Sequence, residues 1–246
     1  MSLRRVHLPP ERIGAEAAAL TPEARHYLRD VLRLAPGAAV ELFDGAGGAW
    51  RATIDAAFEQ LTLGARREAR PALRLTLLVA LAKGEKLELV VQKATELGAT
   101  DLFPFAAERS VVKLDGEKGE ARAERWRRIA EEAARQCGRA DVPRVAAPGP
   151  LEAALQALPP GCAAFVFHPG GQPLPPLSEE GGPGLVLTPG GVAAVVGPEG
   201  GLTDREVEAC ERTGARRATL GPRILRAETA ALVAAALLQS RYGDLG

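Results

Sequence analysis

The chain has 246 residues, and its 31 lysine and arginine residues are matched by 31 aspartate and glutamate residues, so its formal net charge is zero. Zero net charge excludes a global electrostatic attraction to nucleic acid or membrane, and any basic surface therefore has to be local. The length allows one large domain or two smaller ones, and we expect two.

Residues 1–70 predict a small β-barrel that carries one helix. The stretch TPEARHYLRDVLRL offers Thr21 as N-cap and Pro22 as the first helical residue, and its apolar positions share one face. The runs AVELFDG, GAWRATIDAAF and QLTLGARRE are short and β-prone, with turn signals such as DGAGG between them. A polar, proline-containing stretch at residues 65–73 then marks a domain boundary.

Residues 71–246 predict an α/β domain. The apolar strand LRLTLLVAL, the helix KGEKLELVVQKATELG and the strand TDLFPF follow one another, which is typical of a mostly parallel sheet with helices on its faces. Further strands are expected at CAAFVFHP and VAAVVG, and two helices end the chain. The last of them is apolar all round, which fits burial on two sides. Residues 170–191 are rich in glycine and proline and predict an exposed loop.

A glycine-rich turn, GPEGG at residues 197–201, follows the strand VAAVV. A helix begins directly after it, with Thr203 and Glu206 in the spacing of a capping box. Glycines let a flat ligand approach the main chain closely. The turn has no GxGxxG pattern and no following GK[ST], which excludes a dinucleotide fingerprint and a P-loop. Glu199 at its tip would repel a phosphate, although it could also only bond the amides of its own turn.

A second turn of this kind lies in LGPRILRAETAALV, residues 220–233. Gly221 and Pro222 interrupt the chain after a short strand, and charged residues occupy the entry to the apolar last helix. Because α/β sheets bind ligands at the carboxyl ends of their strands, the two turns predict a shared pocket. In the alternative reading, Arg226 and Glu228 only pair with each other or with Glu199.

No motif points to a metal site, a disulfide framework or a membrane segment. The three cysteines lack CxxC spacing and the three histidines lie far apart in the sequence. The first residues have no apolar signal core, and the longest apolar run falls short of the ~20 residues that span a bilayer. We therefore expect a cytoplasmic protein without a metal and without a membrane partner.

GPEGGLTDREV together with LGPRILRAETA resembles the signature of the SPOUT superfamily of S-adenosylmethionine-dependent RNA methyltransferases, specifically the RsmE type, which methylates N3 of a uridine in small-subunit ribosomal RNA. HYLRDVLRL, ELFDGAGG, KGEKLELVVQKATELGATDLFPF, ERSVVK and RWRRIAEEAARQCGR occur in the same order, so the resemblance covers nearly all of the chain except residues 170–191.

The resemblance implies a PUA-like RNA-binding barrel at residues 1–70 and a methyltransferase domain with a deep trefoil knot at residues 71–246. It also implies a homodimer, S-adenosylmethionine as cofactor, and small-subunit ribosomal RNA or its assembly particle as partner. The expected cofactor-binding residues are Phe167, His168, Gly197, Pro198, Glu199, Gly200, Gly201, Leu220, Gly221, Ile224, Leu225 and Thr229.

Transfer of a methyl group to N3 requires loss of a proton and stabilisation of the anion that results. The candidates are Glu199 or Glu228 as base or sulfonium partner, and Arg223 or Arg226 for charge on the uracil oxygens. Candidate RNA-binding residues are Arg4, Arg5, Arg25, Arg29, Arg33, Arg109 and Arg139. Two other functions stay open: a non-catalytic RNA-binding or ribosome-assembly dimer, and a methyltransferase that acts on a ribose hydroxyl or a guanine.

Overall fold

The computed structural model describes residues 3–69, 71–110, 112, 116–178 and 184–246, which form two compact units. The N-terminal unit contains the residues up to 70 together with residues 131–142, and the C-terminal unit contains residues 71–130 and 143–246. Residues 131–142 thus belong to the first unit, although they lie far beyond the domain boundary that the sequence predicts at residues 65–73. They do so because Ala134 and Ala140 pack in one apolar cluster with Phe43 and Ala49.

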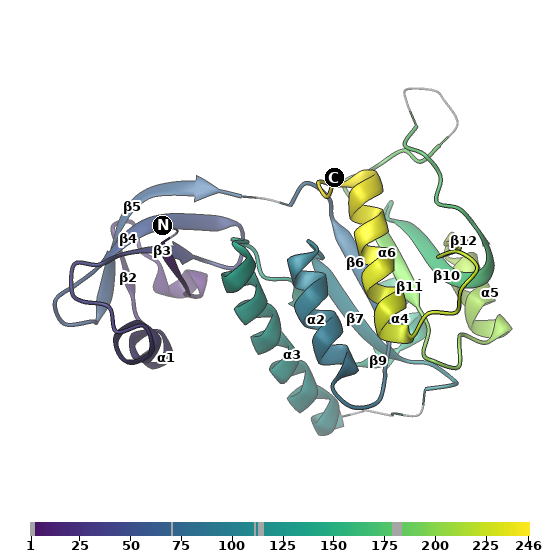
Figure 1. The fold of residues 1–246 in the computed structure, drawn as a ribbon, viewed down its shortest axis with the longest axis horizontal. Coiled ribbons are helices and arrows are strands. Elements are labelled where there is room, and N and C mark those ends of the chain that lie inside the picture. Colours follow the sequence, from purple (N-terminus) through teal and green to yellow (C-terminus); the bar gives the residue numbers. More distant parts are fainter. Residues whose placement is uncertain (1–2, 70, 111, 113–115, 179–183) are drawn as a thin grey trace. The chain divides into compact units, whose positions relative to one another are not determined.

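The N-terminal unit is built on a five-stranded curled sheet (Figure 1). Its order is β1-β3-β4-β5-β2, with β1 parallel to β3 and the other pairings antiparallel. The sheet encloses a core in which Leu8, Leu28, Leu42 and Leu61 are fully buried. The strands are β1 Arg4–His7, β2 Ala17–Ala19, β3 Ala39–Phe43, β4 Gly48–Ile54 and β5 Gln60–Glu68.

One helical segment packs against this sheet, as the sequence predicts. A 3-10 turn at Pro10–Arg12 precedes it in the chain, and the helix α1 spans Pro22–His26 and continues as a π-helical turn at Tyr27–Val31. The side-chain oxygen of Thr21 accepts a hydrogen bond from the Ala24 amide at 3.1 Å. Thr21 therefore is the N-cap, which supplies a partner for one of the amides that the first helical turn leaves unpaired.

The C-terminal unit contains a seven-stranded sheet, and every pairing in it is parallel. The order is β12-β10-β11-β6-β7-β8, and β9 also pairs with β7. All side chains of β6 and β11 are buried, as expected for a parallel sheet that is covered on both faces. The strands are β6 Leu75–Ala80, β7 Asp101–Ala106, β8 Arg144–Val145, β9 Gly149–Pro150, β10 Ala163–Gln172, β11 Val192–Val196 and β12 Arg216–Ala218.

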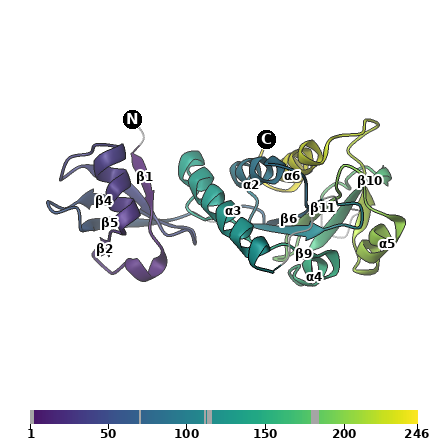
Figure 2. The same cartoon turned by 90° about the horizontal axis from the view of Figure 1, so that it is seen from below.

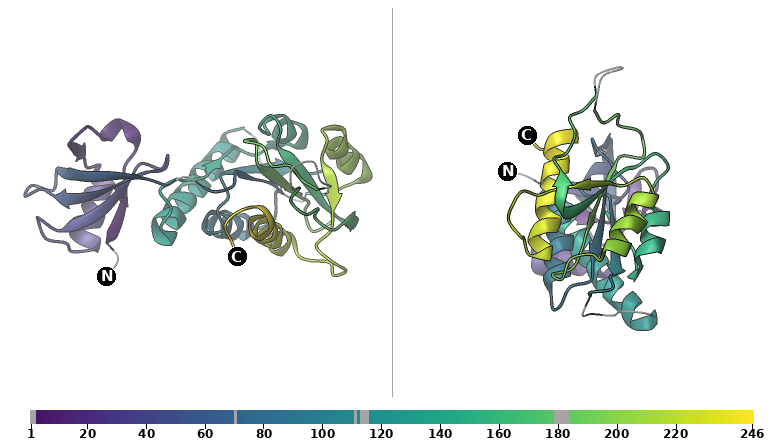
Figure 3. Two further views of the ribbon diagram at one scale, coloured as in Figure 1. Left: turned by 90° about the horizontal axis from the view of Figure 1, so that it is seen from above. Right: turned by 90° about the vertical axis from the view of Figure 1, so that its right-hand side faces the viewer.

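Helices cover both faces of this sheet, which confirms the predicted α/β architecture. The helices α2, Lys86–Glu96, and α6, Ala227–Tyr242, lie side by side on one face, whereas α4, Leu151–Gln156, and α5, Asp204–Arg212, lie on the other (Figure 2). Figure 3 shows the last helix and α5 on opposite sides of the sheet. A further helix, α3, spans Gly116–Cys137. Across the described ranges, no helix has the length and apolar character needed to cross a membrane.

The segment 170–191 is not a loop throughout. Strand β10 continues to Gln172, and its first half pairs with both β11 and β12. The hydroxyl of Tyr242 and Nε of Arg241 both donate to the carbonyl oxygen of Pro175, at 2.6 and 3.1 Å. These bonds tie the segment to the end of α6, which a prediction from local composition could not include. Residues 179–183 lie outside the described part of the chain.

Candidate functional site

Two turns at the carboxyl edge of the parallel sheet enclose a pocket. The first turn, residues 197–203, follows β11, and the second turn, residues 219–226, follows β12. Both strands pair with β10, so the two turns lie on either side of it at the same edge. The pocket between them has a volume of about 350 Å³. Pockets of ~300–1,000 Å³ hold small ligands and cofactors in proteins.

Most of the residues expected to bind a cofactor line this pocket. They are Phe167, His168, Gly197, Pro198, Glu199, Gly200, Gly201, Leu220, Gly221, Ile224 and Leu225. Arg109, expected to bind RNA, and Arg223, expected to act in catalysis, also line it. Thr229, Arg226 and Glu228 are not among the lining residues, although Ala227 and Ala230 of the same segment are.

The first turn has an internally bonded backbone. The Gly201 amide donates to the carbonyl of Pro198 at 2.9 Å, and Gly201 has a φ of 71°, in the left-handed region that favours glycine. At Gly197 a Cβ atom would lie 2.9 Å from the main-chain nitrogen of Leu202. Glycine at this position is therefore required by close approach of the backbone and not by its φ.

Glu206 holds the first turn to the segment that follows β7. Thr203 and Glu206 form the predicted capping box: the Glu206 amide donates to the Thr203 hydroxyl, and the Thr203 amide donates to Oε2 of Glu206 at 2.8 Å. Oε1 of the same buried carboxylate accepts from the Glu108 amide, also at 2.8 Å. One residue further, Arg109 donates to the carbonyl of Gly200 at 2.9 Å. The first turn is thus held by α5 and by the segment that follows β7.

Lys86 connects the two glutamates that the sequence suggests for catalysis. Its Nζ donates to Oε1 of Glu199 and lies 3.6 Å from Oε2 of Glu228. The hydrogen bond from Lys86 holds the pKa of Glu199 below its usual value, and the main-chain N–H of Glu199 and the charge of Lys83 act in the same direction. Glu199 and Glu228 therefore pair with Lys86 and not with Arg226.

The second turn makes fewer contacts. Its Gly221 amide donates to the hydroxyl of Thr219 at 3.1 Å. Arg223 and Arg226 are exposed, and neither takes part in an ion pair with any of the described residues. Ile224 is 91% exposed although it lines the pocket. A large apolar side chain in that position is available to cover a ligand.

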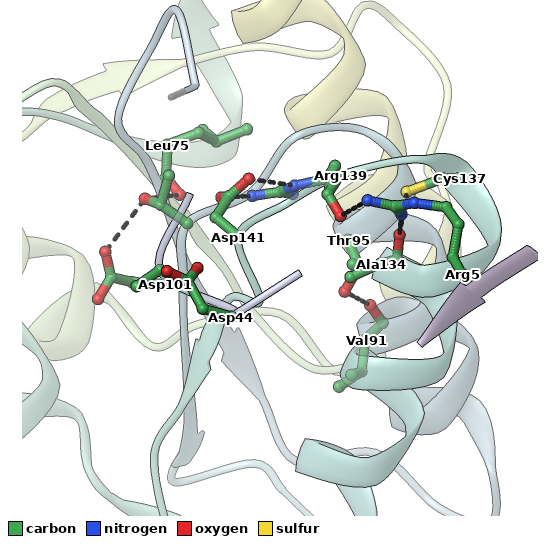
Figure 4. A network of polar contacts seen from close by, with 12 residues as sticks. Arg5, Asp44, Leu75, Val91, Thr95, Asp101, Ala134, Cys137, Arg139 and Asp141 are labelled. Atoms are coloured by element: carbon green, nitrogen blue, oxygen red, sulfur yellow. Dashed lines mark hydrogen bonds and ion pairs between the residues drawn. The ribbon is translucent and has the colours of Figure 1, made fainter. Parts of the chain in front are cut away.

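The arginines predicted to bind RNA in the N-terminal unit fall into two groups. Arg5 pairs with Glu41 at 2.7 Å. Figure 4 shows that Arg5 also donates to the carbonyls of Ala134 and Arg139, at 2.9 and 2.8 Å. Arg139 in turn pairs with Asp141. Their side chains are only 11% and 13% exposed, so these two guanidinium groups stabilise the unit from within.

The other four arginines lie nearer the surface. Arg29 is exposed but pairs with Asp30 at 3.0 Å, and Arg25 is partly buried. Arg4 and Arg33 are exposed and form no ion pair within the described ranges. Arg4 and Arg33 are therefore the ones most available to a phosphate.

Sequence reasoning missed the bridging role of Lys86 and the second role of Glu206. The signal for Lys86 was present, because KGEK directly follows a buried strand and the carboxyl ends of parallel strands meet at one edge. The bond from Glu108 to Glu206 had no such signal, since it joins residues 98 positions apart. No group of three or more histidine, cysteine, aspartate or glutamate side chains among the described residues is arranged to hold a metal ion.

Comparison with known proteins agrees with this architecture. Residues 69–239 match the family of RNA methyltransferase domains, and residues 20–63 match the family of RNA methyltransferase PUA domains. The chain is 34% identical to the ribosomal RNA small subunit methyltransferase E of Synechocystis over 250 residues, which covers 96% of this chain and 77% of that protein. It is 43% identical to the Bacillus subtilis protein of the same name over 155 residues, which cover 63% of this chain and 60% of the Bacillus protein.

Among the solved structures that match nearly the whole chain are two with a bound cofactor. One is a ribosomal RNA small subunit methyltransferase E from Neisseria gonorrhoeae bound to S-adenosylmethionine, with 29% identity, a TM-score of 0.85, and coverage of 99% of this chain and 100% of that chain. The other is a putative methyltransferase from Legionella pneumophila with the same cofactor bound, with 32% identity, a TM-score of 0.84, and complete coverage of both chains. This chain therefore belongs to the RNA methyltransferase family that includes the ribosomal RNA small subunit methyltransferases E.

Proposed function

We propose that this protein uses S-adenosylmethionine to methylate N3 of a uridine in small-subunit ribosomal RNA. The observation that carries the proposal is the pocket between the two turns, with Glu199 among its lining residues, inside the segment that matches RNA methyltransferases. Two relatives solved with the cofactor and several named for small-subunit ribosomal RNA support it. The choice of N3 of uridine rests on the family resemblance.

The lining of the pocket fits this cofactor. Phe167, Val196 and Leu225 offer apolar surface to an adenine ring, and the glycines of the first turn allow close main-chain approach. Glu199 offers negative charge to a sulfonium, whereas it would repel the phosphates of a nucleotide. The carboxylate is ionised at neutral pH, and because the hydrogen bond from Lys86 lowers the pKa of Glu199, it keeps its charge at more acidic pH than an ordinary glutamate.

The bound cofactor would supply a methyl group on a positively charged sulfur, and the chain has to orient it and prepare the uracil. A carboxylate with a lowered pKa is a weak base, so we assign Glu199 to the sulfonium and not to the N3 proton. Arg223 and Arg109 line the pocket and would stabilise negative charge on the uracil oxygens, which makes loss of the N3 proton to solvent easier. Glu228, Arg226 and Thr229 receive no direct role.

The first experiment measures methyl transfer to small-subunit ribosomal RNA and assembly particles, with mass spectrometry to place the new methyl group. We expect one methyl group at N3 of a uridine. R223A should lower kcat about 100-fold, the effect of removing one donor from a developing negative charge. E208Q, at an exposed position of α5, should leave the rate unchanged. If the new methyl group were on a ribose or on a guanine, the assignment of uridine as the substrate would be wrong.

RNA binding is assigned to the N-terminal unit, which contains the PUA match and the exposed Arg4 and Arg33. If these two arginines contact phosphates, R4A/R33A should weaken binding to all RNA sequences alike. The slope of log affinity against log salt should fall by about 0.7–0.9 for each lost contact. R217A is the control, because that guanidinium pairs with Glu211. An unchanged slope in R4A/R33A would remove these residues from the RNA interface.

A non-catalytic assembly dimer is the main alternative function, and ligand binding separates the two. S-adenosylmethionine at 100 times its dissociation constant should stabilise the folded enzyme by about 2.7 kcal/mol, whereas a scaffold without a cofactor site would melt unchanged.

We also propose a homodimer, supported by Leu89 of α2 and Leu237 of α6, which are 43% and 42% exposed on neighbouring helices. Sedimentation equilibrium tests it. The deep trefoil knot stays a prediction from the resemblance.

A further inference from the structure

Lys86 is not part of the pocket lining, but it contacts Glu199, which lines the pocket, and Glu228, which follows the second turn. It is the first residue of α2 and follows the carboxyl end of β6. Glu199 lies in the first turn, and Glu228 lies in the first helical turn of α6, directly after the second turn. One ammonium group therefore connects α2, the first turn and the start of α6.

We propose that Lys86 is a positioning residue that sets the Glu199 carboxylate toward the cofactor and couples it to the start of α6 through Glu228. This inference rests on the proposed function, because it concerns the same pocket. The side chain of Lys86 is 32% exposed and that of Glu228 only 14% exposed. The contact is thus partly shielded from solvent, which makes its geometry better defined than that of a fully exposed ion pair.

The contacts of Glu228 support the coupling. Its Oε2 is buried, accepts no hydrogen bond within the described residues, and has the Lys86 ammonium as its neighbouring positive charge. A buried carboxylate oxygen without a compensating charge is costly, so loss of Lys86 would favour movement or protonation of Glu228. Either response would change the conformation at the start of helix α6, which directly follows residues 219–226 of the second turn.

The charges of the cluster also suit a positively charged ligand. One ammonium between two carboxylates leaves the cluster with one net negative charge, and one member of the cluster, Glu199, lines the pocket with a side chain that is 43% exposed. The other charged or titratable groups near Glu199 are Lys83, Arg109, His168 and Arg223. Because the substitution leaves those groups in the sequence, a change in the behaviour of Glu199 in that variant can be assigned to Lys86.

The experiment compares two ligands that differ by one charge: S-adenosylmethionine, a sulfonium cation, and S-adenosylhomocysteine, its demethylated and uncharged counterpart. In K86M we expect S-adenosylmethionine to bind about three- to tenfold more weakly, while the affinity for S-adenosylhomocysteine stays within twofold. K86R should restore most of the loss, because it keeps a positive charge at the same position. K93M, on the same helix and paired with Glu96, is the matched control.

The pH dependence gives a second measurement that general damage to the fold would not produce. Glu199 has a lowered pKa in the wild type, so binding of S-adenosylmethionine holds until the pH falls through that value. Without Lys86 the pKa of Glu199 returns upward, and the acid limb of S-adenosylmethionine binding should move to higher pH in K86M. Binding of S-adenosylhomocysteine should show no such movement.

The outcomes separate the two proposals. If the wild type binds neither ligand, the proposed function fails. If the wild type binds both, and K86M loses equal affinity for both or gains affinity for the cation, then Lys86 does not position Glu199 and the inference is wrong while the function stands. An acid limb that is identical in wild type and K86M leads to the same conclusion.

Discussion

The two turns that enclose the pocket differ in how firmly the protein holds them. The first turn has a capping box, a bond between its own amide and carbonyl groups, and contacts from Arg109 and Lys86. The second turn has a bond from the Gly221 amide to Thr219 and a row of exposed side chains that ends at Arg226. The same pocket thus has one preformed wall and one weakly held wall.

This difference indicates a division of roles. A preformed wall reduces the entropy that a ligand has to overcome, and it keeps Glu199 where the sulfonium is expected. A weakly held wall can open to admit the cofactor and then close over it, since segments with few buried contacts open at low free-energy cost. Variants in the first turn should therefore change both stability and affinity, whereas variants in the second turn should change affinity alone.

The largest effect is expected from G197A in the first turn. Its new Cβ would meet the main-chain nitrogen of Leu202 at 2.9 Å, so the turn itself has to move. We expect a loss of about 1–3 kcal/mol of stability by overpacking and at least a 30-fold weaker binding of S-adenosylmethionine, measured by urea unfolding and calorimetry.

The control for this substitution is G149A, where a Cβ atom would have no neighbour within 4 Å. It should behave as the wild type in both measurements. Wild-type affinity in G197A would mean that the first turn can shift without consequence, and its description as a preformed wall would have to be abandoned.

A smaller effect is expected from E206Q, which keeps the size of the side chain at this position. Both oxygens of Glu206 accept hydrogen bonds, and the amide group of glutamine would place a donor against one of those N–H groups. We expect a loss of about 1–3 kcal/mol of unfolding free energy. The affinity for S-adenosylmethionine should fall about tenfold, because the Arg109 segment loses its anchor.

E208Q, on the exposed side of the same helix, is the control for loss of charge. If E206Q matched it in thermal melting, the bond from Glu108 to Glu206 would not contribute to the first turn.

The sequence predicts the parts of the site that depend on local rules. In most folds, glycine and proline directly after an apolar strand indicate a turn, and threonine three residues before glutamate indicates the start of a helix. Here these residues line or support the pocket. The internal pairing of Arg5 and the bridge of Lys86 were not predicted. Arg5 looks like part of a basic run, but the carbonyl groups to which it donates in Ala134 and Arg139 are 129 and 134 positions away, and no local pattern encodes them.

The smallest effect is expected from I224A in the second turn. The side chain is 91% exposed, so its loss should change stability by less than about 0.5 kcal/mol. The affinity for S-adenosylmethionine should still fall about three- to tenfold, because apolar surface that covers the ligand is lost. Calorimetry and thermal melting on one preparation measure the two quantities.

V186A is the matched control, since Val186 is 69% exposed and lies outside the pocket lining. It should change neither quantity. A drop in stability in I224A without a change in affinity would reverse the roles that we assign to the two turns.

Hydrogen exchange with and without S-adenosylmethionine tests the account most directly, because it measures both turns in one protein. We expect amides of residues 219–226 to gain strong protection when the cofactor binds, amides of residues 197–203 to be protected already and to change little, and the N-terminal unit to stay as it was. Saturating S-adenosylmethionine that leaves residues 219–226 unprotected, or that protects another part of the C-terminal unit in their place, would contradict it.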